Sequence, residues 1–153
     1  MASRAEALRN LGERLRQEGL RLAYHAHEPE MRAAAREYHH MMLATDPAVV
    51  ELCLDTHWVY RGADNSQVAL SDIARLYAGR IAVLHLRQSR GGVWAETFGE
   101  GDIDYRPLLK NLRLAGFSGP VYLEQPREAG TPATMDIFEA HRRGLRALKA
   151  MLG

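Results

Sequence analysis

The sequence predicts an α/β protein in which parallel strands alternate with helices. Four short, continuous apolar runs occur along the chain, and such runs are typical of strands covered on both faces. Helical patterns separate the runs, and the spacing of about 30 residues suits right-handed crossover connections. The predicted strands cover residues 20–24, 49–54, 81–84 and 121–123.

One helix precedes the first strand, and a second follows it. Apolar residues recur at helical spacing from Ala5 to Leu15, so residues 4–18 are predicted to form an amphipathic helix. Gly19 ends this helix, because glycine tolerates the left-handed backbone that closes many helices. Residues 33–44, which begin with three alanines, are predicted to form the next helix.

Three further helices complete four strand–helix units. Two of them are each opened by a residue whose side chain can cap the first turn. They cover residues 67–77, after Ser66, and residues 105–114, after Asp104. The last helix is predicted to open at Thr131-Pro132 or at Thr134. Its apolar stripe consists of Ile137, Phe138, Leu145, Leu148, Met151 and Leu152.

Length and composition predict a single domain over residues 1–153. The chain is 46% hydrophobic and 25% charged, with a formal net charge of +1. This charge balance argues against a nucleic-acid partner, and no apolar run reaches the roughly 18 residues of a membrane span. The N-terminus lacks the apolar stretch of a secretory signal, and a single cysteine fits a reducing compartment, so we expect a cytoplasmic protein. The chain is shorter than the roughly 200 residues of a complete eight-stranded barrel.

Polar, ligand-capable residues follow each predicted strand. Residues two apart on a strand point the same way, and parallel strands bring their carboxyl ends to one edge of the sheet. Imidazoles and carboxylates gathered there suit a divalent cation such as Mn, Mg, Co, Zn or Fe, without selecting one of them. The predicted pairs are His25 with His27, Asp55 with His57, and His85 with Arg87, and Glu124 ends the fourth strand.

Other polar residues are interpreted as structural. His39 and His40 lie within a predicted helix and are expected on a solvated face. Cys53 lies in an apolar strand and is expected to be a small core residue. Residues 99–102 lack the lysine and the Ser/Thr of a phosphate-binding loop, so they are predicted to form a turn.

Five motifs occur in a fixed order along essentially the whole chain. They are Tyr24-His25-Ala26-His27 with Glu30, Leu54-Asp55-Thr56-His57-Trp58, Val83-Leu84-His85-Leu86-Arg87, residues 98–104, and Leu123-Glu124. This set resembles the sugar phosphate isomerase/epimerase family of the xylose-isomerase-like barrel superfamily, which includes inosose dehydratases, tagatose epimerases and hydroxypyruvate isomerases. The match is to strands five to eight of the family's barrel. The resemblance therefore implies half of a TIM (β/α)8 barrel, with four parallel βα units preceded by one helix.

The resemblance also implies roles for individual residues. Asp55, His85 and Glu124 match three ligands of a divalent metal, and Glu30 matches the first ligand, with His25 and His27 as alternatives. Glu124, with Glu30 or His25 as its counterpart, is implied to act as acid and base. The implied substrate-binding residues are His27, His57, Trp58 and Arg87, and Arg87 stands where many relatives have lysine.

The implied function is a metal-dependent isomerase, epimerase or dehydratase that acts on a sugar, sugar phosphate or polyol through an enediolate. Three alternatives stay open. One is an endonuclease for abasic sites, which the low net charge disfavours. Another is a non-haem iron site that includes Asp55 and His85. The third is a non-catalytic metal- or ligand-binding subunit. Because half a barrel leaves two open sheet edges, we expect a homodimer or pairing with a complementary half-barrel.

Overall fold

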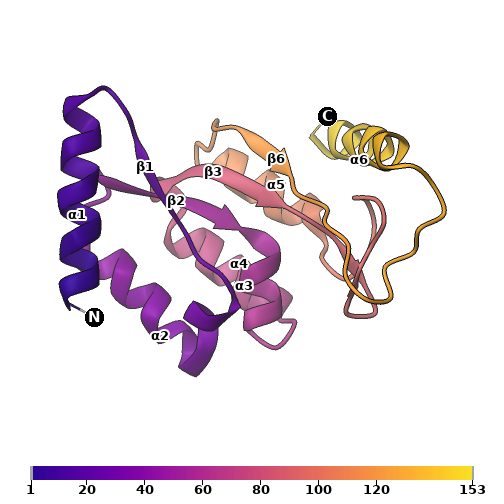
Figure 1. Ribbon diagram of the computed structural model, residues 1–153, viewed down its shortest axis with the longest axis horizontal. Helices are drawn as coiled ribbons and strands as arrows, with labels where there is room; N and C mark the ends of the chain where they lie inside the picture. Colours follow the sequence, from indigo (N-terminus) through magenta and orange to yellow (C-terminus); the bar gives the residue numbers. More distant parts are fainter. Residues whose placement is uncertain (1, 153) are drawn as a thin grey trace.

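The computed structural model describes residues 2–152, in which helices surround a central parallel sheet (Figure 1). The strands of this sheet are β1 (Leu22–His25), β2 (Val50–Asp55), β3 (Ile81–Leu86) and β6 (Val121–Leu123). The helices are α1 (Ala2–Gln17), α2 (Glu28–Ala44), α3 (Thr56–Gly62), α4 (Gln67–Leu76), α5 (Tyr105–Leu114) and α6 (Ile137–Leu152), with a 3-10 turn, η1 (Ala78–Arg80), before β3. A short antiparallel hairpin joins β4 (Ser89–Arg90) to β5 (Val93–Trp94).

The four main strands lie in the order β1-β2-β3-β6, and all three pairings are parallel. This confirms the predicted α/β fold and the half-barrel arrangement of four βα units after one helix. Within residues 2–152 the sheet is not closed, because β1 pairs only with β2 and β6 only with β3. In the same part of the chain, no helix is long and apolar enough to cross a membrane.

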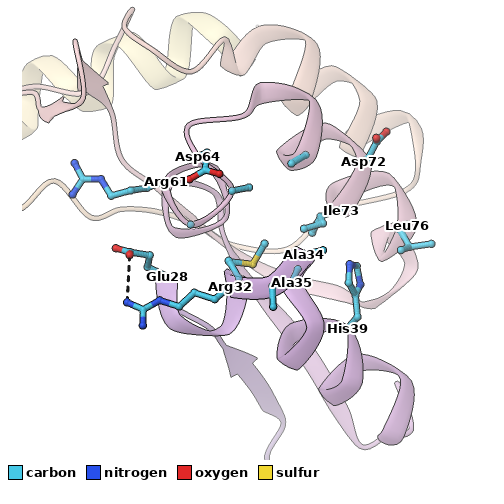
Figure 2. Close-up of a pocket in the computed structure, with 15 residues that line it drawn as sticks. Glu28, Arg32, Ala34, Ala35, His39, Arg61, Asp64, Asp72, Ile73 and Leu76 are labelled. Atoms are coloured by element: carbon cyan, nitrogen blue, oxygen red, sulfur yellow. Dashed lines mark ion pairs between the residues drawn. The ribbon is translucent and has the colours of Figure 1, made fainter.

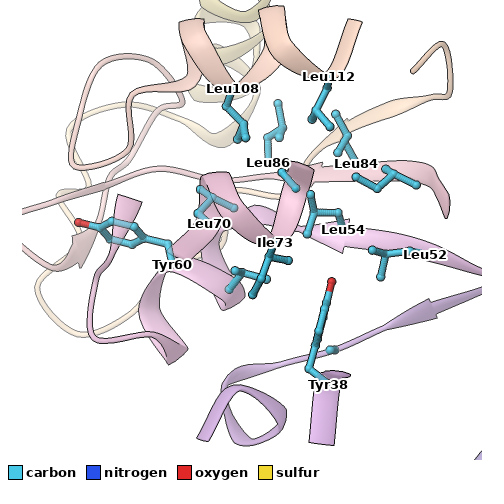
Figure 3. Close-up of a cluster of buried hydrophobic side chains, with 14 of the residues drawn as sticks. Tyr38, Leu52, Leu54, Tyr60, Leu70, Ile73, Leu84, Leu86, Leu108 and Leu112 are labelled. Atoms are coloured by element: carbon cyan, nitrogen blue, oxygen red, sulfur yellow. The ribbon is translucent and has the colours of Figure 1, made fainter. Parts of the chain in front are cut away.

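Alternation along the strands separates the core from the candidate site. Leu52 and Leu54 of β2, and Leu84 and Leu86 of β3, are fully buried. They pack with side chains of the surrounding helices, among them Leu70, Ile73, Leu108 and Leu112 (Figure 3). The residues between them on β2 and β3 therefore point to the opposite face of the sheet. That face carries Cys53, Asp55 and His85.

Helix α3 is absent from the sequence prediction. The chain turns from β2 directly into this helix at Thr56, and the Asp55 side chain accepts hydrogen bonds from the backbone N–H groups of His57 and Trp58, at 3.0 and 2.9 Å. The predicted strand-like pairing of Asp55 with His57 is therefore wrong, because alternation stops where the helix begins. Asp55 both ends a strand and caps a helix.

Helix α2 starts earlier than predicted, at Glu28, and is interrupted at Ala33–Ala35. These three residues have φ between 52° and 59°, a left-handed conformation that costs energy for residues other than glycine. The expectation that His39 and His40 lie on a solvated face is also wrong. Both are half-buried, and His39 Nδ1 lies 2.6 Å from the Tyr77 hydroxyl.

Helix α6 also differs from its prediction. It begins at Ile137, and the Asp136 side chain, not that of Thr131 or Thr134, accepts from the backbone N–H of Glu139 in the first turn. Only the later part of the predicted apolar stripe meets the core: Leu148 is buried, and Met151 and Leu152 pack beside it. Ile137, Phe138 and Leu145 are exposed.

Candidate metal centre

Four side chains from four strands meet at the carboxyl edge of the sheet. His25 ends β1, Asp55 ends β2, His85 lies near the end of β3, and Glu124 follows β6. Each offers one ligand atom, and these four atoms all lie within 4.8 Å of one another. His25 Nε2 is 3.3 Å from Asp55 Oδ2, and His85 Nδ1 is 3.0 Å from Glu124 Oε2. The parallel register, which sets Asp55 opposite His85, brings them together.

Asp55 is the buried anchor of this cluster. Its Oδ1 caps α3, and its Oδ2 faces both His25 and the Arg87 guanidinium, whose Nη2 donates at 2.9 Å. Burial alone raises the pKa of this carboxyl, but the hydrogen bond with His25 and the charge of Arg87 outweigh it, so the Asp55 pKa is lowered. Asp55 is therefore ionised at neutral pH even though it is almost fully enclosed.

Arg87 lies between the two carboxylates. Its Nη2 donates to Asp55 Oδ2 at 2.9 Å and to Glu124 Oε2 at 3.0 Å. The guanidinium carbon is 4.9 Å from the ring centroids of both Trp58 and Trp94, and the side chain is only 3% exposed. Arg87, which the resemblance implies to be a substrate-binding residue, is thus buried and already paired with two carboxylates.

His25, not Glu30, lies with Asp55, His85 and Glu124. The Glu30 carboxylate accepts a hydrogen bond from the His27 backbone N–H at 3.0 Å, in the first turn of α2. The His27 ring lies beside the cluster, 4.7 Å from the His25 ring and 5.4 Å from Trp58. Of the three alternatives for the first ligand, His25 is the one that the fold places among the other donors.

His57 is enclosed within the protein beside Trp94, with 6.2 Å between ring centroids. Within residues 2–152, neither of its ring nitrogens has a hydrogen-bond partner. Burial, with smaller contributions from Arg61 and Arg87, lowers the pKa of His57 to about 4, so its ring is neutral at pH 7. The His57 ring therefore lies inside the protein beside Trp94, and not at the surface of the site.

Cys53 lies one step further down the same face of β2. It is buried as predicted, and its sulfur lies within 4.8 Å of nitrogen atoms of His25 and His85. Burial, together with the nearby charges of Asp55 and Glu124, raises the pKa of this thiol to about 12. The thiol is therefore protonated at neutral pH, and its sulfur lies beside the two imidazoles that also face Asp55 and Glu124.

The rim beside the cluster is built from contacts that sequence reasoning missed. Arg61 of α3 pairs with Glu128 at 2.8 Å and lies 4.9 Å over the Trp94 ring. Glu128 also accepts from the Trp94 backbone N–H. These partners are up to 67 residues apart, so no local signal in the sequence identifies them.

Two side-chain amides, one buried and one half-buried, join the loops after β3 and β6. Gln88 is fully buried; its side chain accepts from the N–H groups of Ser89 and Ile103 and donates to two carbonyls of the loop. Gln125 accepts from the Gln88 backbone N–H and donates to the carbonyls of Gln88 and Ala95. The amides thus connect both loops at several points.

A separate hollow of about 730 Å³ lies among α2, α3 and α4 (Figure 2). Its lining includes the Ala33–Ala35 segment, His39, Arg61 and Asp64. Glu28 and Arg32 form an ion pair of 3.8 Å at its margin. None of the four clustered side chains lines this hollow, so it is distinct from the candidate metal centre.

The cluster has the donor chemistry of a divalent-metal site. It combines two imidazole nitrogens with two carboxylate oxygens. This set suits divalent first-row transition-metal ions, Mn²⁺ among them. Fold and site together define a class: half of a TIM barrel with a candidate metal centre at the carboxyl ends of its strands, where barrel enzymes place their active sites.

The comparisons with known proteins agree with this class. The chain belongs to the xylose isomerase-like TIM barrel family, whose model matches residues 1–151. It is 28% identical over 167 residues to an inosose dehydratase of Lacticaseibacillus casei, covering 97% of this chain and 53% of that protein. It is 30% identical over 149 residues to an inosose dehydratase of Geobacillus thermodenitrificans, covering 88% and 49%.

A solved structure gives the same fold. A sugar phosphate isomerase/epimerase from Parabacteroides distasonis superposes with a TM-score of 0.75 at 19% identity, covering 99% of this chain and 52% of that one. The chain thus spans about half the length of the relatives that it matches.

Proposed function

We propose that His25, Asp55, His85 and Glu124 hold a divalent metal ion, and that the site isomerises, epimerises or dehydrates a sugar, sugar phosphate or polyol. The convergence of these four side chains within 4.8 Å is the observation that carries the proposal. The names of the matched relatives, inosose dehydratase and sugar phosphate isomerase/epimerase, support the substrate class. A bound divalent ion would supply Lewis-acid stabilisation of negative charge on adjacent substrate oxygens.

Glu124 is the proposed base. Its side chain is 48% exposed at the rim, and its Oε2 is held by His85 and Arg87. Within residues 2–152 its other oxygen, Oε1, has no hydrogen-bond partner, which leaves that atom to take a proton from a substrate carbon and give an enediolate. His25, or the predicted alternative Glu30, would supply the proton that the enediolate takes up, while Glu124 keeps the proton it has taken. His27 and Trp58, beside His25, would form the wall that orients the sugar.

His85→Ala tests the metal site. The His85 side chain is half-buried and contacts Glu124, and it takes no part in the cap of α3. The variant is therefore expected to fold but to retain far less Mn²⁺ or Zn²⁺ after dialysis. His141→Ala is the matched control, because His141 is an exposed histidine of α6 whose ring hydrogen-bonds the Ile137 carbonyl of its own helix, away from the four clustered side chains. Bound metal is measured by elemental analysis. Equal metal content in the wild type and His85→Ala would refute the proposed ligand set.

We also propose that the four-stranded unit acts as a pair with a second copy of itself. In residues 2–152 the edge strands β1 and β6 each have one free side. A two-fold axis would let β6 of each copy pair with β1 of the other, giving a closed ring of eight parallel strands. The exposed Ile137, Phe138 and Leu145 of α6, a helix that packs on β6, supply apolar surface beside that edge.

The pairing is checked by the mass of the protein in solution. Light scattering after gel filtration is expected to give twice the 17.2 kDa of one chain. A monomeric mass together with measurable turnover would refute the paired arrangement but leave the metal site standing. A monomer that binds metal without turning over any sugar would favour the alternative, a non-catalytic metal-binding unit or one that needs a complementary half-barrel.

A further inference from the structure

The four candidate ligands are linked through one arginine. Asp55 Oδ2 contacts His25 Nε2 and Arg87 Nη2, and Glu124 Oε2 contacts His85 Nδ1 and the same Nη2. The oxygens that would bind a metal are therefore the ones that Arg87 already bridges. Trp58 and Trp94, each 4.9 Å from the guanidinium, hold it in place.

We propose that Arg87 is an internal counter-cation of the site, which holds the Asp55 and Glu124 carboxylates close together at the expense of metal affinity. The inference rests on the proposed metal site and adds to it a residue that sets how tightly the ion is held. The Arg87 guanidinium is a cation in direct contact with both carboxylates, so it repels a metal ion bound to them.

The formal charges show the direction of the effect. The two carboxylates and Arg87 sum to −1, so a divalent ion leaves the group at +1. Without Arg87 the carboxylates sum to −2 and a divalent ion neutralises them. Because Arg87 and Asp55 are buried, a unit charge a few ångströms from the ion changes its binding free energy substantially.

The competing interpretation is that Arg87 binds an anionic group of the substrate. Its side chain is 3% exposed, and two tryptophan rings and two carboxylates surround it. Little of this side chain is therefore left for a substrate anion to contact. The observed contacts therefore favour a partner inside the protein.

Arg87→Met and Arg87→Gln test the proposal with Mn²⁺ alone as the probe, by titration calorimetry. Both remove the charge, and the glutamine keeps a hydrogen-bond donor in case the methionine variant fails to fold. We expect the Kd for Mn²⁺ to fall at least about tenfold. We also expect the thermal midpoint of the metal-free variants to fall and to recover when Mn²⁺ is added.

Arg61→Met is the matched control. Arg61 stacks on the same Trp94 ring at 4.9 Å, but it pairs with Glu128 and contacts none of the four ligands. Its loss should leave the Kd for Mn²⁺ within about twofold of the wild type, because its charge is already balanced outside the cluster.

The outcomes separate the two proposals. If the wild type binds Mn²⁺ and both Arg87 variants, folded by circular dichroism, bind it equally or more weakly, Arg87 is not a counter-cation, and the metal site stands. If neither the wild type nor the variants bind Mn²⁺, Zn²⁺ or Co²⁺, both proposals fail. Tighter binding in the variants, with no change in Arg61→Met, is the result that the structure leads us to expect.

Discussion

Asp55→Ala is expected to abolish metal binding and to lower the free energy of unfolding by about 3–5 kcal/mol. Two losses add to give this effect. The backbone N–H groups of His57 and Trp58 lose the carboxylate that caps α3. Arg87, with its side chain 3% exposed, loses one of its two carboxylate partners inside the protein. Denaturant unfolding and elemental analysis of the same preparation measure both effects.

Asp55→Asn separates the two roles of this residue. The amide oxygen still accepts from the first turn of α3, while the negative charge is gone, so we expect a smaller loss of stability than in Asp55→Ala but the same loss of bound metal. Metal retained by both variants would exclude Asp55 as a ligand. Equal destabilisation by both would show that the cap contributes little.

Arg80→Met is expected to cost about 3 kcal/mol of stability without changing the metal site. Arg80 is buried in the turn before β3 and donates to the carbonyls of Val50 and Met42 and to the Thr45 hydroxyl. It thereby ties the end of α2 to the start of β2. A methionine of similar length fills the space but leaves these buried acceptors without their donor.

Urea unfolding measures this loss, and Arg9→Met is the control. Arg9 lies half-exposed on α1, 4.0 Å from Glu13, and its replacement should change stability by less than about 0.5 kcal/mol. Mn²⁺ affinity in Arg80→Met should match that of the wild type. Equal unfolding midpoints for the wild type and Arg80→Met would mean that water satisfies the three acceptors.

The strands were predictable because each is a short apolar run followed by polar residues, and the half-barrel arrangement was implied by the resemblance to the barrel family. Residues 121–123 were predicted with their observed bounds, and the observed ends of the other three strands differ by one or two residues. The carboxyl-edge positions of Asp55, His85 and Glu124 follow directly from that pattern, because parallel strands align their ends.

The remaining features depend on geometry that the sequence does not display. The start of α3 was missed because Asp55 belongs at once to a strand and to a helix cap. Choosing between His25 and Glu30 required knowing that the chain enters α2 at Glu28, which turns Glu30 back toward the His27 N–H. The pairing of Arg87 with two carboxylates joins three strands, and local patterns carry no information about such distances.

The side-chain amides of Gln88 and Gln125 have a consequence for how this site can diversify. They tie the loop after β3 to the chain beyond β6, so a single change in either loop disturbs hydrogen bonds in both. Within the described residues, the Ala33–Ala35 stretch inside α2, the helix after β1, has no comparable brace; its side chains are small and its backbone is strained. New substrate preferences should therefore arise more readily from substitutions on the β1 side of the rim, while the β3–β6 side stays constant as the rigid support of the ligands.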